Sequence, residues 1–231
     1  DNLFGAEREY KTTFGTSVVK LFGLTAACTG ASEKALRHAG AEYEKAYLHP
    51  YSHATYYPGA QMMHLKLLFS REGRILGAQI VGRDGVDKRI DVIATAMQAG
   101  MTVRDLQDLE LAYAPPYGSA KDPVNFAGYV ATNLLRGDTG VVHADAIPEQ
   151  ALLLDVREIP EFSSGALPGA RLMPLGTIRE RLSELPRDRE IVVYCAVGIR
   201  GYLAERILRQ GGFRAKNLSG AYATGKFFHP G

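Results

Sequence analysis

Short apolar runs separated by turn residues characterise the first half of the chain. Residues 11–22 and 43–48 are rich in β-branched or aromatic side chains, which predicts strands. Residues 62–69 and 74–81 flank a polar turn that ends in Gly73, which predicts a β-hairpin. These strands are expected to pair in an antiparallel manner.

Helical spacing of apolar residues recurs between these strands. Residues 31–39, with Ser32 as cap, and residues 87–98 are predicted helices, and a short helix over 102–106 is expected to be capped by Thr102. Asp122-Pro123 predicts the start of a helix that runs to residue 135, because proline is favoured in the first helical turn. The first half is therefore predicted to be α+β.

The hydrophobic pattern changes in the second half. Residues 151–154 and 191–194 are continuous apolar runs that end at Asp155 and Cys195, which predicts a parallel sheet covered by helices. Ligands bind beyond the carboxyl ends of strands in such sheets, so both residues mark a candidate site. The polar, glycine-bearing residues 136–140 separate the halves, and we predict domains at 1–137 and 138–231.

Cys195 stands where a buried strand should meet a helix. The thiolate is the reactive form of cysteine, and a helix N-terminus with a nearby arginine favours it. The alternative is a buried, inert cysteine. The residues that follow form the candidate loop, which comprises Ala196, Val197, Gly198, Ile199, Arg200 and Gly201.

Composition narrows the function classes. The chain has 231 residues, 46% of them hydrophobic and 23% charged, with a net charge of +2 and scattered basic residues, so neither nucleic acid nor a membrane surface is expected as partner. The six histidines lack metal-ligand spacing, and no metal is predicted. Two cysteines do not make a disulfide framework and suit a cytoplasmic protein.

The second half resembles a rhodanese domain over about residues 141–223. The resemblance rests on the segments 153–158, 161–162, 165–170, 193–195, 198–200 and 217–220. It implies that Cys195 accepts a sulfane sulfur as a persulfide, that residues 196–201 hold it, and that Asp155 and Arg157 form a supporting pair. Arg200 is a further catalytic candidate of the loop. Ala166 departs from the family, which usually has histidine there.

The spacing between cysteine and arginine distinguishes two chemistries of this fold. Cysteine phosphatases use a C-x5-R loop, whereas Arg200 follows Cys195 after four residues and Gly201 occupies the phosphatase position. The shorter loop suits a sulfur atom better than a tetrahedral oxyanion, which disfavours a phosphatase or an arsenate reductase.

The first half resembles the dimerisation domain of flavin- and pyridine-nucleotide-dependent disulfide reductases, near the coenzyme A disulfide reductase and NADH oxidase branch. The match covers about residues 8–135 and rests on the segments 15–18, 56–59, 77–82, 85–92, 113–117 and 121–125. It implies a homodimer in which tyrosines reach the partner's flavin side, with Tyr56 and Tyr113 as candidates. The alternative for both is simple packing of an amphipathic aromatic ring.

Together the halves resemble the C-terminal portion of a coenzyme A disulfide reductase–rhodanese fusion, also described as an NADH-dependent persulfide reductase. The resemblance implies FAD, NAD(P)H and coenzyme A for the full-length protein, with none bound by this portion alone, and small persulfides, polysulfides or thiols as substrates. Cys28 lacks the partner of a flavin-side redox cysteine and is assigned to packing. The competing hypothesis is a non-catalytic dimerisation and interaction module.

Overall fold

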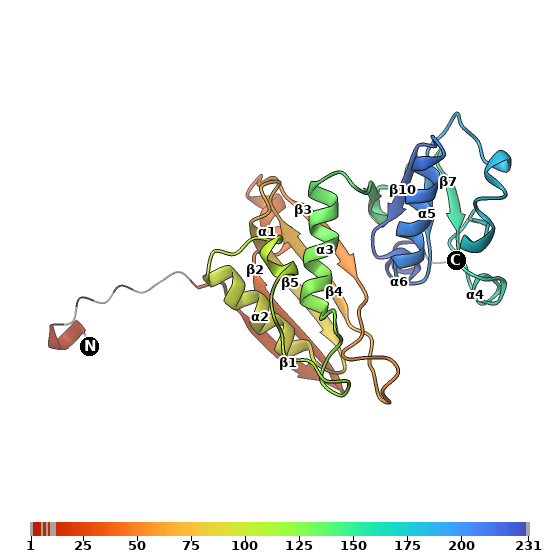
Figure 1. Ribbon diagram of the computed structural model, residues 1–231. Helices are drawn as coiled ribbons and strands as arrows, with labels where there is room; N and C mark the ends of the chain where they lie inside the picture. Colours follow the sequence, from red (N-terminus) through yellow and green to blue (C-terminus); the bar gives the residue numbers. More distant parts are fainter. Residues whose placement is uncertain (1, 6, 8, 10–12, 230–231) are drawn as a thin grey trace.

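Two β-sheets follow one another along the chain (Figure 1). The computed structural model describes residues 2–5, 7, 9 and 13–229. Within them the first sheet has the strand order β1-β2-β5-β4-β3 and pairs throughout in an antiparallel manner, and the second has the order β6-β10-β9-β7-β8 and is parallel. The predicted fold class, α+β followed by a parallel α/β sheet, is confirmed. Across these residues no helix combines the length and the apolar character needed to cross a bilayer.

Helices α2 and α3 cover one face of the first sheet and enclose an apolar core against it (Figure 1). Helix α3 starts at Pro123 as predicted, and Asp122 caps it, because its carboxylate accepts the Val124 amide at 3.0 Å. Ser32 caps α1 through the Ala35 amide. The elements are β1 (Ser17–Leu21), β2 (Leu24–Gly30), α1 (Glu33–His38), β3 (Glu44–Leu48), β4 (His64–Phe69), β5 (Ile75–Gly82), α2 (Val86–Gln98), the 3₁₀ turn η2 (Asp105–Gln107) and α3 (Pro123–Leu135).

Three expectations for this half need correction or restriction. The first strand begins only at Ser17, and residues 11 and 12 of its predicted range lie outside the described residues. Strand β2 was not predicted, because its alanines and cysteine give little β signal. Residues 102–106 do not form the expected helix: Asp105 accepts hydrogen bonds from the Thr102 amide and hydroxyl, and the short turn η2 follows uncapped by Thr102.

The second sheet carries α5 on one face and α6 on the other. Val193 and Cys195 pack with Leu208 of α5, whereas Val192 and Tyr194 pack with the opposite cluster, which is the alternation expected of a strand buried on both faces. The elements are β6 (Val141–Val142), the 3₁₀ turn η3 (Ala144–Ala146), β7 (Leu152–Asp155), α4 (Ile159–Ser163), β8 (Arg171–Leu172), the 3₁₀ turns η4 (Leu175–Thr177) and η5 (Leu182–Glu184), β9 (Ile191–Tyr194), α5 (Ile199–Gln210), β10 (Ala215–Leu218) and α6 (Ala221–Phe228).

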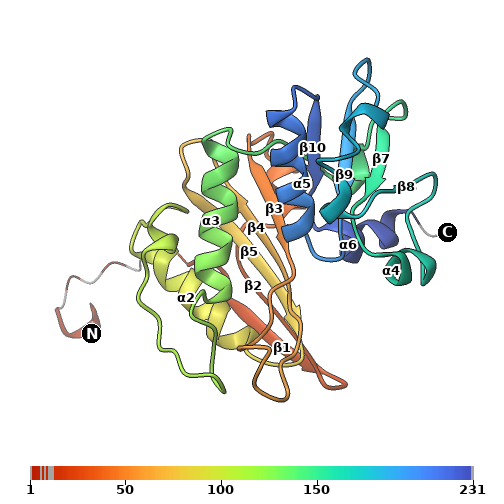
Figure 2. The same cartoon turned by 45° about the vertical axis from the view of Figure 1, so that its right-hand side comes forward.

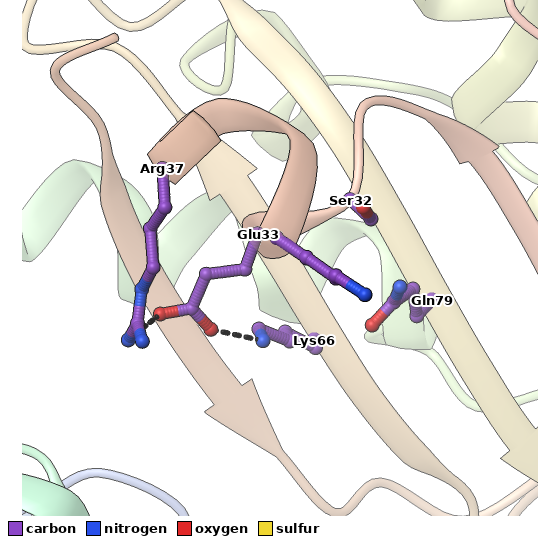
Figure 3. A pocket seen from close by; sticks show the side chains of 6 residues that line it. Ser32, Glu33, Arg37, Lys66 and Gln79 are labelled. Atoms are coloured by element: carbon purple, nitrogen blue, oxygen red, sulfur yellow. Dashed lines mark hydrogen bonds and ion pairs between the residues drawn. The ribbon is translucent and has the colours of Figure 1, made fainter. Parts of the chain in front are cut away.

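Edge strand β3 carries the contact between the two halves (Figure 2). The Tyr47 amide donates to Ser219 Oγ at 3.2 Å, and Lys45 Nζ lies 3.3 Å from Asp145. Lys45 also binds Glu33, whose carboxylate accepts from Arg37 and Lys66 as well (Figure 3). The side chain of Glu33 is only 12% exposed, and although burial raises its pKa, hydrogen bonds from these lysines hold that pKa well below its usual range.

Candidate active site

Cys195 lies directly after β9, at the carboxyl end of the parallel sheet, as predicted. The residues 195–201 that follow, named here the Cys195 loop, turn at Gly198, whose φ of 118° favours glycine, and residues 199–201 of the predicted loop already form the first turn of α5. The Gly198 amide donates to the Cys195 sulfur at 3.1 Å. The loop is therefore curled around the sulfur, and it aims at least one backbone N–H at the position where negative charge would develop.

The opposite side of the Cys195 loop is held by α6. The carbonyl oxygens of Cys195 and Ala196 accept hydrogen bonds from the amides of Tyr222 and Ala223, at 2.9 and 3.0 Å. These amides belong to the first turn of α6, where backbone donors have no partner within the helix. The two carbonyls are thus fixed by α6, away from the Gly198 amide that reaches the sulfur.

Gly201 and Asn217 fit together beneath the loop. A Cβ at Gly201 would overlap Asn217 Oδ1, so a larger residue at this position, where a phosphatase would carry arginine, requires the Asn217 side chain to move. Asn217 comes from the neighbouring strand β10, and its Oδ1 is buried without a hydrogen-bond partner in the described structure. The sequence motif contained Asn217, but only the fold shows that it supports the loop.

Arg200 is paired away from the loop interior. Its guanidinium donates two hydrogen bonds to Glu161, at 2.7 and 2.5 Å, and this arginine lowers the pKa of Glu161 to about 2. The pKa of Arg200 is raised in return, chiefly by Glu161 and to a smaller extent by Cys195. The charge of Arg200 is thus balanced by Glu161. Glu161, in α4, lies in a segment that resembles the rhodanese family, but its pairing with Arg200 was not predicted.

Asp155 and Arg157 form the expected pair. Both are buried, with Arg157 Nη2 2.7 Å from Asp155 Oδ2 and also 2.7 Å from the Gly165 carbonyl oxygen. The Arg157 guanidinium lies 4.2 Å from the centroid of the Tyr222 ring. The pair thus supports the residue whose amide holds the Cys195 carbonyl, and its effect on Cys195 stays a prediction.

Tyr56 and Tyr113, which are far apart in sequence, are brought together. Their hydroxyl oxygens lie 2.6 Å apart, while the residues are 74% and 47% exposed. This hydrogen bond raises the pKa of Tyr56. The reach of these two tyrosines to a partner subunit stays a prediction.

The hollow drawn in Figure 3 belongs to the first half of the chain. It is lined by Ser32, Glu33, Lys34, Arg37, Lys66 and Gln79, which include no residue of the Cys195 loop. Cys195 itself is only 1% exposed, so its sulfur is buried in this structure.

Comparison with known sequences decides which families these two halves match. The model of the pyridine nucleotide-disulphide oxidoreductase dimerisation domain matches residues 16–123, and that of the rhodanese-like domain matches residues 142–225. The chain therefore joins a disulfide reductase dimerisation domain to a rhodanese-like domain. The dimerisation domain carries Tyr56 and Tyr113, and the rhodanese domain carries the Cys195 loop. The boundaries at 137 and 138 stay a prediction.

Relatives containing both domains are known in three dimensions. The reduced CoADR-RHD protein of Bacillus anthracis is 46% identical, with a TM-score of 0.94. This match covers 97% of this chain and 41% of the Bacillus anthracis chain. An NAD-dependent persulfide reductase of A. fulgidus is 40% identical with a TM-score of 0.89, covering 96% and 41%.

A curated relative matches about half of the chain. The coenzyme A disulfide reductase of Staphylococcus haemolyticus is 43% identical over 126 residues, which are 54% of this chain and 28% of that protein. The chain thus spans less than half of the length of each of these relatives. The resemblance to a coenzyme A disulfide reductase–rhodanese protein is confirmed for the two matched domains.

Proposed function

We propose that the rhodanese domain transfers sulfur through a persulfide on Cys195. The Cys195 thiolate attacks the outer sulfur of a persulfide or polysulfide, the donor S–S bond breaks, and the departing thiolate takes up a proton. A thiol acceptor then attacks the outer sulfur of the Cys195 persulfide and regenerates the thiolate, so no external oxidant is needed. The observation that carries this proposal is the 3.1 Å hydrogen bond from the Gly198 amide to the sulfur.

The role of the whole protein is proposed from the relatives. In a longer protein, the FAD and NAD(P)H domains lie outside this chain, and coenzyme A is the thiol carrier that links the rhodanese domain to them. The dimerisation domain pairs two subunits, and the exposed pair Tyr56 and Tyr113 faces the partner's flavin side. Within this chain, these phenols supply hydrogen-bond donors at that surface.

A non-catalytic module is the second candidate, and the low exposure of Cys195 favours it. A trapping experiment separates the two functions. After incubation with polysulfide, peptide mass spectrometry should find added sulfur on Cys195, whereas Cys28, which has no glycine loop around it, provides the internal comparison. Sulfur absent from Cys195, or equal on both cysteines, would support the passive module.

Glu161 should influence which donors are accepted. Replacing it (Glu161→Gln) removes one negative charge beside Arg200 and leaves the arginine free to attract anionic donors. We expect KM for an anionic donor such as thiosulfate to fall by about threefold, with the effect weakening as salt is added. Steady-state kinetics with thiosulfate and with a neutral organic trisulfide measure this.

Glu180→Gln is the matched control for this prediction. Glu180 is exposed in the same domain, and its replacement changes the net charge equally. An equal fall in KM for both variants, or an equal response of the neutral donor, would contradict a local role of Glu161.

A further inference from the structure

A histidine of the dimerisation domain reaches the start of α6. His49, which follows β3 and is 8% exposed, places Nε2 3.0 Å from the Gly220 carbonyl oxygen and 3.0 Å from Thr224 Oγ1. Because a carbonyl only accepts, Nε2 of His49 carries the proton. Its Nδ1 then accepts from Nδ1 of His64, 2.8 Å away on β4. Both ring nitrogens are thus used, and the orientation of the ring is fixed.

Neutral His49 agrees with its surroundings. Burial lowers its pKa to about 4, and His64 and Lys226 add repulsion to a protonated ring. The same ring arrangement therefore persists throughout the neutral pH range.

The segment that His49 contacts has an unusual backbone. Gly220 and Ala221 have φ angles of 75° and 48°, two successive left-handed residues, and Ala221 is fully buried. A non-glycine residue keeps such a conformation only when its surroundings enforce it. The bond from His49 to the Gly220 carbonyl is one of the contacts that do so.

The next two amides hold the Cys195 loop. The Tyr222 amide donates to the Cys195 carbonyl and the Ala223 amide to the Ala196 carbonyl. A shift at Gly220 would therefore move the donors that fix the loop, and with them the alignment of the Gly198 amide on the sulfur.

We propose that His49 is a positioning residue for the Cys195 loop, acting through Gly220 and the first turn of α6. The dimerisation domain thereby holds the sulfur site of the rhodanese domain in its reactive shape. This inference deepens the proposed sulfur transfer, but it concerns the reactivity of the thiol, which can be measured without any sulfur donor.

The test is the alkylation rate of Cys195 by iodoacetamide as a function of pH, in a Cys28→Ser background. His49→Ala should move the midpoint of the rate curve upward by about half a pH unit, which lowers the alkylation rate about threefold at pH values well below the midpoint. His49→Gln should bring the midpoint most of the way back to that of the unmodified protein, because the glutamine amide can donate to the Gly220 carbonyl. Thr224→Val, which keeps the shape of the side chain, should shift the midpoint in the same direction by less.

His53→Ala is the matched control. His53 is also buried in the dimerisation domain, but its hydrogen bond in the described structure goes to Ala54. An unchanged midpoint in both His49→Ala and Thr224→Val, or an equal shift in His53→Ala, would overturn the proposal. If His49→Ala shifts the alkylation midpoint but Cys195 takes up no sulfur from polysulfide, the positioning role of His49 is supported and the proposed sulfur transfer is contradicted.

Discussion

Cys195→Ser should abolish sulfur transfer by the rhodanese domain, lowering the rate by roughly three orders of magnitude or more. A serine hydroxyl at this position stays protonated at neutral pH, and it cannot form the S–S bond on which transfer depends. The substitution replaces one buried atom within an intact loop, so the fold should remain. The rate of sulfur transfer from polysulfide to a thiol acceptor measures the effect.

Cys28→Ser is the natural control for this result. Cys28 lies on β2, where its sulfur is 3.2 Å from Ser17 Oγ, and no loop amide surrounds it. We expect this variant to transfer sulfur at the unmodified rate. If Cys195→Ser transferred sulfur as fast as the unmodified protein, Cys195 would not be the residue that carries the sulfur.

Acid should weaken the contact between the two domains well before carboxylates are protonated. Burial lowers the pKa of His49 and of His143 to about 4, from an ordinary value of 6.5, and both rings lie where the domains meet. Between these values the unfolded chain binds protons that the folded chain does not, so stability falls as the pH falls from about 6.5 to 4. The pKa of Glu33 is lowered in the folded protein, so its contribution to folding stability is retained until the pH drops below 4.5.

The expected loss between pH 7 and pH 5 is roughly 2 to 4 kcal/mol of unfolding free energy, about 2 for each histidine. Urea denaturation at both pH values measures it, and proteolysis within residues 136–140 reports separation of the domains. His49→Gln should remove about half of the pH dependence, and replacing the exposed His38 in the same way should remove none. A stability that is constant from pH 7 to 5 would show that these rings do not titrate as their burial requires.

The strand that precedes the site could be predicted residue by residue. Residues 191–194 are four apolar positions between a charged residue and a cysteine, and β9 occupies that range. The turn at Gly198 and the helix after it also follow from local sequence, because glycine at a left-handed position and helical spacing are short-range signals. Strand β2 was not predicted from the sequence, because its stability comes from pairing with β1 and β5 rather than from its own residues.

The contacts that surround the sulfur could not be predicted from local pattern. Glu161 and Arg200 are 39 residues apart, and His49 and Gly220 are 171 residues apart. No periodicity links such residues. The packing of α4 and α5 brings the first pair together, and the contact between the two domains brings the second pair together. Family resemblance named the members of the loop, but it assigned Arg200 no partner.

If sulfur transfer proceeds as proposed, the first turn of α6 sets a lower limit on the size of the part of the chain that can carry it out. A shortened protein that stops at Ser219 would keep every residue of the cysteine motif, yet the carbonyls of Cys195 and Ala196 would lose their donors. Engineers who transplant this chemistry into another scaffold should therefore carry the last helix along with the loop.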